Sequence, residues 1–194
     1  MAASSLEALQ AEQSADAPVE IHWRSFELRP QGAPPPSPDY LAKVEAGRPR
    51  LYAIAKEQYG IEMNPGPSGL DSRPALIGAK VAESMGKGSA YNLRVLHAYW
   101  EEAADIENPA ILADLAEEAG LPRDEFLAGL NEPRFAVQVD EDIALASEYG
   151  LGGVPAMVFQ NRYLVSGAQP LAVLRQVVEQ VRNDDNKPSE RNEA

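Results

Sequence analysis

The sequence predicts an α/β protein in which short strands near the two ends of the chain flank a long helical block. Residues 19–23 alternate apolar and polar side chains, as a half-buried strand does, and residues 154–166 have the pattern of a tight antiparallel hairpin. The residues between them carry helical periodicity with caps and prolines at the expected ends. Strands on both sides of a helical block indicate an α/β domain with an inserted all-helical domain.

The N-terminal region begins with a predicted helix over residues 4–15. Leu6 and Leu9 give this segment an apolar side, and Pro18 prevents its continuation because proline lacks a backbone N–H. The strand that follows places Val19, Ile21 and Trp23 on one face. Residues 29–38 contain five prolines and are predicted to be a loop.

The helical block starts where Ser37 can cap a helix that has Pro38 in its first position. This helix is predicted to end at Gly60, with an interruption at Gly47 and Pro49. Further helices are predicted over residues 74–85, after a cap at Ser89, from Asn108-Pro109 to Gly120, after Pro122, and over 134–149.

The C-terminal region is predicted to form the hairpin, with strands at 154–160 and 163–166, and then a last helix. That helix opens at Gln169-Pro170 and has Leu171, Leu174 and Val178 on one face. Residues 184–194 are polar and are predicted to be a disordered tail.

Composition excludes several classes of protein. The 194 residues contain 17 Lys and Arg against 30 Asp and Glu, a net charge of −13, which opposes binding to nucleic acid or to an anionic membrane surface. No run of about 18 apolar residues predicts a membrane span, and no signal peptide is recognised, so a cytoplasmic location is expected. The absence of cysteine excludes disulfides, thiolate metal sites and thiol catalysis by this sequence.

The remaining polar residues have ordinary structural interpretations. His22 and His97 lie on different predicted elements without a second ligand or a catalytic partner, so neither is assigned a catalytic or metal-binding role. The paired acids, including Asp140-Glu141-Asp142, are interpreted as solvated helix faces. The segment 86–89 lacks the spacing of a phosphate-binding loop. No metal site and no cofactor are predicted.

Pro155 stands inside a strand-like run, after Gly152 and Gly153. Proline is normally excluded from such a run. Spacing alone favours a trans proline that opens an edge strand, because cis bonds are about 5–6% of X–Pro bonds.

Two motifs carry a resemblance to a known family. The segment 22–28 (HWRSFEL) followed by a proline-rich loop, and the segments 153–159 (GVPAMVF) and 163–169 (YLVSGAQ), resemble the DsbA-like thioredoxin-fold proteins in their FrnE-like branch. The helical block between them resembles the helical domain inserted in that family. The resemblance covers residues 3–182. It implies a thioredoxin-like domain made of residues 1–36 and 150–183, with a helical insertion over 37–149.

The resemblance implies a cis bond at Pro155 and a substrate-binding role for Gly153, Val154 and Pro155, whose backbone would pair with an extended peptide. It also implies a redox centre, Cys-x-x-Cys, at the start of the first helix, where the helix dipole stabilises a thiolate. This sequence has no such motif. The first strand and the motif would lie about 15–25 residues before Met1. We therefore expect a chain that is shortened at its N-terminus, with the first strand of the sheet missing and no catalytic residue of its own.

The function that the resemblance implies is that of a cytoplasmic DsbA-like protein disulfide oxidoreductase or isomerase, redox-inactive without its cysteines. Its partners would be extended peptides or protein thiol and disulfide substrates. One alternative is a glutathione-binding enzyme of the kappa-class glutathione transferase or 2-hydroxychromene-2-carboxylate isomerase type, which uses serine as nucleophile; Ser4 and Ser5, however, follow no predicted strand. The other is a peptide-binding module without catalysis. The sequence does not determine the oligomeric state.

Overall fold

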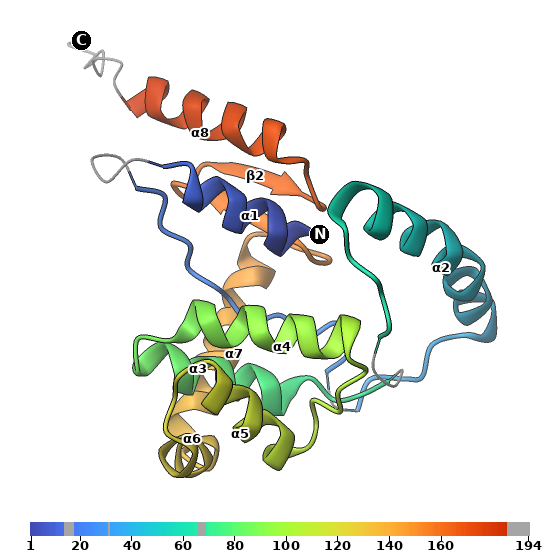
Figure 1. Cartoon of the computed structure of the whole chain (residues 1–194), viewed down its shortest axis with the longest axis vertical. Coiled ribbons are helices and arrows are strands. Elements are labelled where there is room, and N and C mark those ends of the chain that lie inside the picture. The colour runs from blue at the N-terminus through green and yellow to red at the C-terminus, as the bar shows by residue number, and fades with distance from the viewer. Residues whose placement is uncertain (14–17, 31, 66–68, 186–194) are drawn as a thin grey trace. The chain divides into compact units, whose positions relative to one another are not determined.

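The computed structural model describes residues 1–13, 18–30, 32–65 and 69–185, and these ranges are mostly helical with one small antiparallel sheet (Figure 1). The elements are α1 (Ala2–Ala11), α2 (Pro38–Tyr59), α3 (Arg73–Ser84), α4 (Gly88–Glu101), α5 (Pro109–Glu118), α6 (Arg123–Leu130), α7 (Pro133–Glu148), β1 (Ala156–Phe159), β2 (Tyr163–Ser166) and α8 (Leu171–Asp185). None of the helices in these ranges is long and apolar enough to cross a bilayer.

The chain divides into two compact units. The first contains Met1–Glu20 and the chain from Gly153 onward, and the second contains Ile21–Gly152. The domain boundaries expected at residues 36 and 150 stay a prediction. Of the predicted disordered tail, Asp184 and Asp185 belong to α8, and residues 186–194 lie outside the described ranges.

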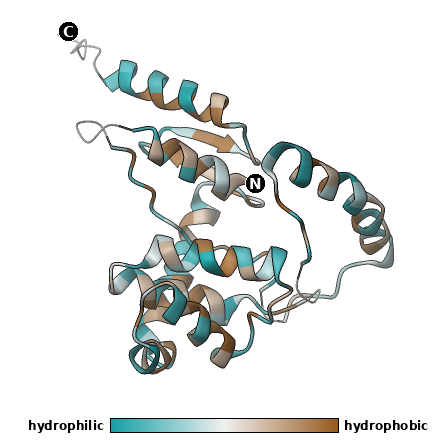
Figure 2. Ribbon diagram, in the orientation of Figure 1, coloured by the Kyte–Doolittle hydropathy of each residue, from teal (hydrophilic) through white to brown (hydrophobic). Residues whose placement is uncertain are grey.

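The first unit is built on the hairpin that the sequence predicts. β1 and β2 pair in the register Met157↔Val165 and Val158↔Leu164, and α1 packs against α8. Figure 2 shows α8 with apolar bands along its length, as expected for a helix that covers a sheet. The small core of this unit consists of the buried residues Leu9, Leu174 and Val178, with Met157 and Phe159 packed against them.

The second unit contains α2 and a bundle of α3 to α7, which packs around one core. Tyr91 and Phe126 lie at its centre, both fully buried, with ring centroids 5.2 Å apart and planes inclined by 43°. Three alanines of α3 belong to this core, which lets the neighbouring helices approach α3 closely. The main core of the described protein is therefore in the helical block.

Local chemistry explains the helix ends. The side chain of Ser37 accepts a hydrogen bond from the Tyr40 amide, and that of Asn108 accepts one from Ala110, so both predicted caps are confirmed. Gly60 ends α2 in the left-handed conformation, with φ of 68°.

Two predicted starts are shifted. α4 begins at Gly88 rather than after Ser89, because the chain turns tightly there: the Lys87 amide donates to the Ala82 carbonyl. α1 spans Ala2–Ala11 rather than residues 4–15; residues 14 and 15 are outside the described ranges.

The predicted strand over residues 19–23 is wrong. These residues have no ladder partner among the described residues, and a strand is defined by its hydrogen-bonded neighbour. The alternation itself is observed in the exposure of the side chains, because Val19, Ile21 and Trp23 are half-buried and the residues between them are exposed, but such a pattern does not supply a neighbouring strand. The described residues therefore form a two-stranded sheet and eight helices.

The predicted interruption of α2 is also wrong, because the helix is continuous through Gly47 and Pro49. Pro49 removes the N–H that would bond the Glu45 carbonyl one turn earlier. Both residues are exposed, so water can satisfy that carbonyl. Solvent exposure explains why proline is tolerated at this position.

Candidate functional site

The loop before β1 contains the three residues for which the sequence predicts substrate binding. The peptide bond between Val154 and Pro155 is cis, which confirms the expectation drawn from the family resemblance and corrects the one drawn from spacing. The Pro155 carbonyl accepts a hydrogen bond of 2.8 Å from the Gly167 amide, at the end of β2. The loop is therefore joined to both strands of the hairpin.

The backbone of this loop is open to a ligand. Val154 is 51% exposed, and a Cβ placed on Gly153 would meet nothing within 4 Å. None of the hydrogen bonds among the described residues involves Gly153 or Val154. An extended peptide could pair with such a backbone by adding a strand next to β1. The substrate-binding role of Gly153, Val154 and Pro155 stays a prediction.

The nucleophile of thiol–disulfide chemistry has no counterpart in this sequence, which contains no cysteine. The two serines considered for the alternative chemistry lie inside α1, where Ser5 is 95% buried and its amide bonds the Met1 carbonyl. Among the described residues, neither Ser4 nor Ser5 has a hydrogen bond to a histidine, and His97 of α4 pairs with Glu102, just past the end of that helix, at 2.8 Å. The described residues hold no cluster of three side chains suited to a metal ion.

The second unit has a cavity of about 490 Å³ that the sequence did not predict. It is lined by the segment 21–25, by α3 and by the start of α4. Its charged side chains are Arg24, Lys80, Glu83 and Lys87, and His22 also lines it. The sequence assigned His22 no catalytic or metal-binding role, and the structure places it at the lining of this cavity.

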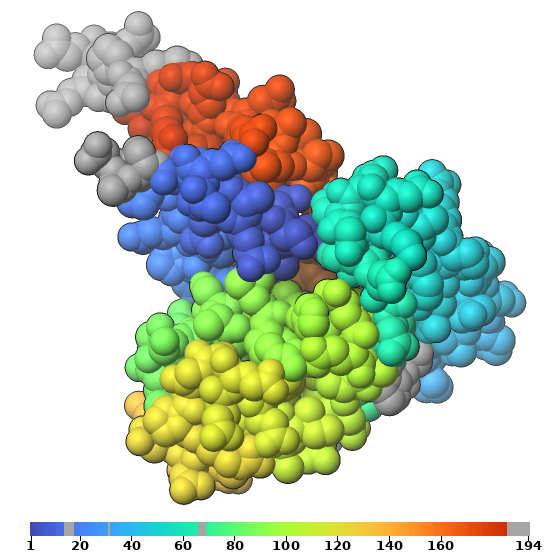
Figure 3. Space-filling view, viewed as in Figure 1, coloured from blue at the N-terminus to red at the C-terminus, as the bar shows by residue number. Residues whose placement is uncertain are grey.

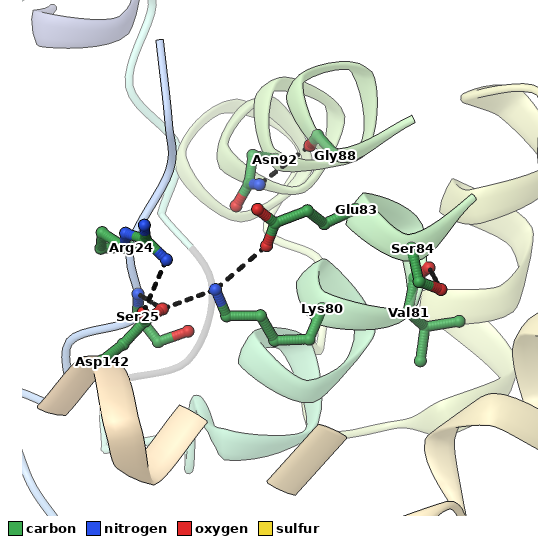
Figure 4. Close-up of polar contacts among 9 residues, drawn as sticks. All are labelled: Arg24, Ser25, Lys80, Val81, Glu83, Ser84, Gly88, Asn92 and Asp142. Atoms are coloured by element: carbon green, nitrogen blue, oxygen red, sulfur yellow. Dashed lines mark hydrogen bonds and ion pairs between the residues drawn. The ribbon is translucent and has the colours of Figure 1, made fainter. Parts of the chain in front are cut away.

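A buried ion pair lies beside that cavity (Figure 4). The Lys80 ammonium group lies 2.6 Å from Asp142 Oδ2 and 3.0 Å from Glu83 Oε2, and the side chains of Lys80 and Asp142 are each 95% buried. Asp142 also accepts hydrogen bonds from the Ser25 amide at 2.8 Å and from Arg24 at 3.2 Å. This carboxylate joins the segment around Ser25 to α3 and α7.

The interpretation of Asp142 as a solvated acid is therefore wrong. Its neighbour Asp140 does face solvent, where it pairs with Arg73 at 2.6 Å. Residues two apart on a helix point in different directions, so one run of acids can supply both a surface and a core group. Position around the helix could have separated the two acids, because Asp142 lies three residues after the buried Val139 and four before the buried Ala146, and so on the same side of α7.

Comparison with known proteins identifies the family to which this chain belongs. Residues 1–179 match the DSBA-like thioredoxin domain, and the chain belongs to that family. A curated relative, YwbO of Bacillus subtilis (strain 168), described as uncharacterized, is 33% identical over 123 residues, which is 58% of this chain and 57% of the relative. The match thus spans little more than half of that relative's length.

Solved structures share the fold. A probable DsbA oxidoreductase, SCO1869 of Streptomyces coelicolor, superposes with a TM-score of 0.76 at 25% identity, covering 96% of this chain and 85% of that one. A 2-hydroxychromene-2-carboxylate isomerase gives 0.75 at 24% identity, covering 96% and 92%. The cytosolic disulfide reductase DsbM of Pseudomonas aeruginosa, with glutathione, gives 0.61 at 21% identity, covering 92% of each chain. The protein is thus similar in fold both to disulfide oxidoreductases and to the isomerase.

Proposed function

We propose that this chain supplies the peptide-binding face of a cytoplasmic DsbA-like protein disulfide oxidoreductase or isomerase. The observation that carries the proposal is the unpaired, exposed backbone of Gly153 and Val154 directly before β1. An extended substrate would add as a strand along this backbone, with main-chain hydrogen bonds giving affinity and little sequence preference. Pro155, which has no N–H, would hold the loop beside the substrate without competing for its acceptors.

In this proposal the chain binds extended peptides but does not catalyse disulfide exchange. Exchange requires a thiolate that attacks a disulfide sulfur and forms a mixed disulfide while the other sulfur leaves as a thiolate. The 194 residues contain no cysteine and therefore no thiol that could become this thiolate. An insulin-reduction assay of this chain should therefore give the rate of the buffer control, and a rate above that control would contradict this part of the proposal.

Glutathione is the second candidate ligand. The structurally similar DsbM was solved with glutathione, and that similarity of fold supports testing it here. Glutathione is a short peptide with a free thiol, so its amide groups could pair with the same Val154 backbone. The cytosolic description of DsbM likewise supports the proposed cytoplasmic location.

The test is a titration followed by NMR amide shifts. An extended peptide with its cysteine alkylated, and separately reduced glutathione, are added to the labelled chain. The expected result is a saturable shift of the Gly153, Val154 and Ala156 amides with the peptide, and the amides of the second unit's core act as the internal control. Shifts with glutathione alone would favour the second candidate. Shifts elsewhere, or none with either ligand, would overturn the proposed site.

A further inference from the structure

The cavity of the second unit is large enough to hold a small organic molecule. Its volume of about 490 Å³ falls in the range of about 300–1,000 Å³ that is usual for small-molecule sites. The segment 21–25 lines it from one element and the start of α4 from another. Ser89 and Ala90 of α4 are exposed, so the cavity opens to solvent. Figure 3 shows the turn that joins α3 to α4, coloured green, at the surface.

The hydroxyl group of Ser25 indicates that this cavity takes a ligand. Ser25 is only 4% exposed and lines the cavity, and its amide donates to Asp142. Its hydroxyl, however, has no hydrogen-bond partner among the described residues. The hydroxyl is also not among the unpaired side-chain atoms that are fully sealed in the described residues, which belong to Tyr91 and Arg94. Because buried polar groups are normally hydrogen-bonded, a free hydroxyl that still reaches open space is suited to a bound group.

The start of α4 offers further donors to the same cavity. The helix has no side-chain cap, and the amides of Gly88, Ser89 and Ala90 donate to no acceptor among the described residues. All three residues line the cavity. The ammonium group of Lys87 lies 3.5 Å from a Cβ built on Gly120, and so turns away from these amides. Free amides at the positive end of a helix dipole bind anionic oxygens.

Arg24 brings a positive charge that is only partly used. Its guanidinium group donates one hydrogen bond, of 3.2 Å, to Asp142, and its side chain is 56% exposed. A guanidinium group has five N–H donors, so most of those of Arg24 are available to a ligand. Figure 4 shows Arg24 and Ser25 as neighbours on the same segment, with Lys80 between them and α4.

The balance of charge in the cavity favours an anion. Three basic residues, Arg24, Lys80 and Lys87, line it against one acid, Glu83. With the buried Asp142 beside the cavity also counted, one positive charge remains. In the whole chain, by contrast, acids outnumber basic residues by 30 to 17. The cavity is therefore a locally basic place in an acidic protein.

We propose that this cavity binds a small organic phosphate. The amides at residues 88–90 and the hydroxyl of Ser25 donate to the phosphate oxygens, and Arg24 supplies the counter-charge. The organic part packs against Trp23 and Leu76, which also line the cavity. A phosphate suits these donors better than a carboxylate, because it has three terminal oxygens and a charge of about −1.5 to −2 near pH 7. All of these residues belong to the second unit, and the inference does not depend on the proposed peptide binding.

The first test is a titration of the labelled chain with phenyl phosphate, followed by NMR. The expected result is a saturable shift of the amides of Gly88, Ser89 and Ala90. Benzyl alcohol, which is neutral, should give no such shift, and phenylacetate, which has two anionic oxygens, should bind at least about threefold more weakly. The absence of these shifts with phenyl phosphate, or equal binding of either comparison compound, would overturn the proposal.

A pair of serine variants tests the free hydroxyl. Ser25→Ala should weaken the binding of phenyl phosphate about tenfold, because it removes a hydrogen bond to a charged group. The control Ser84→Ala removes a hydroxyl of α3 that bonds the Val81 carbonyl at 2.7 Å, and its affinity should stay within about twofold of the original. Unchanged affinity in Ser25→Ala would contradict the assignment. The amide shifts of the core in each free variant show that it is folded.

A pair of glutamate variants tests the charge of the cavity. Glu83→Gln removes the one acid that lines it and should strengthen the binding of phenyl phosphate about threefold. Glu125→Gln changes the net charge equally on α6, where the side chain is exposed and does not line the cavity, so its affinity should be that of the original chain. A Glu83→Gln variant that binds no more tightly than Glu125→Gln would overturn the proposed anion site.

Discussion

The hydroxyl group of Tyr91 occupies the space in which a side chain at Gly78 would have to lie. A Cβ added to Gly78 would overlap this hydroxyl and would approach Cζ of Phe126 to 2.8 Å. Gly78 lies in α3 and Tyr91 in α4, so the absence of a side chain at one position sets how closely the two helices pack. The core of the second unit is organised around this contact.

Gly78→Ala should destabilise the protein by about 1–3 kcal/mol, the usual cost of overpacking, although alanine favours helix more than glycine does. The measurement is urea unfolding. Tyr91→Phe in the same chain should recover part of the loss, because it removes the hydroxyl and leaves the ring contacts. Independent, additive effects of the two substitutions would contradict the proposed overlap.

Tyr91→Phe alone should leave the protein as stable as before or up to about 1 kcal/mol more stable, because the Tyr91 hydroxyl is buried without a hydrogen-bond partner among the described residues. Burial also raises the pKa of this hydroxyl. Above the ordinary tyrosine pKa of about 10, the unfolded chain therefore loses the proton while the folded chain keeps it, and stability falls as pH rises.

Urea unfolding at pH 9 and at pH 11 checks this dependence. The original chain should lose more stability over that interval than Tyr91→Phe does, by up to about 1.4 kcal/mol for each pH unit above 10. Equal losses in the two proteins would show that Tyr91 does not contribute to the alkaline dependence.

Asp142→Asn should destabilise the protein by about 3 kcal/mol, because it leaves the buried ammonium group of Lys80 without its main counter-charge. The amide oxygen can still accept from Ser25, so the effect reports on charge. The double variant K80M/D142N removes both charges and should be more stable than D142N alone. Urea unfolding measures the stability of both variants. A double variant less stable than D142N would contradict the pairing of Lys80 with Asp142.

Val154→Pro should weaken the binding of an extended peptide about five- to tenfold, because it removes the N–H that the proposed strand addition uses. Val154→Ala also removes the two methyl groups of valine but keeps the backbone N–H. The affinity of this variant for the peptide should therefore stay within about twofold of that of the original chain. Fluorescence anisotropy with a labelled peptide measures both. Equal losses in the two variants would indicate that the side chain, and not the backbone, binds the peptide.

The sequence predicted best those features that depend on neighbouring residues. The caps at Ser37 and Asn108 and the left-handed Gly60 depend on side chains within a few positions, and each lies where it was predicted. The hairpin was also predicted, because both of its strands and its turn are contiguous in sequence.

Features that depend on distant residues were missed. The segment 19–23 has a strand pattern but no strand to pair with in the described residues, and pattern alone cannot supply one. The pairing of Lys80 with Asp142 joins residues 62 positions apart, and nothing in either local sequence indicates the other. α2 continues through Pro49 because the helix is exposed to solvent there, and this exposure could not be predicted from the local sequence.

The hydrogen bond from the Gly167 amide to the Pro155 carbonyl has a consequence for binding entropy. Because this bond joins the loop to the end of β2, the conformational freedom of residues 153–155 is reduced when the hairpin folds. A peptide that adds beside Val154 would then lose mainly its own freedom, since the surface it meets is already ordered. Affinity at this loop should accordingly respond more to rigidity in the peptide than to further rigidity in the protein.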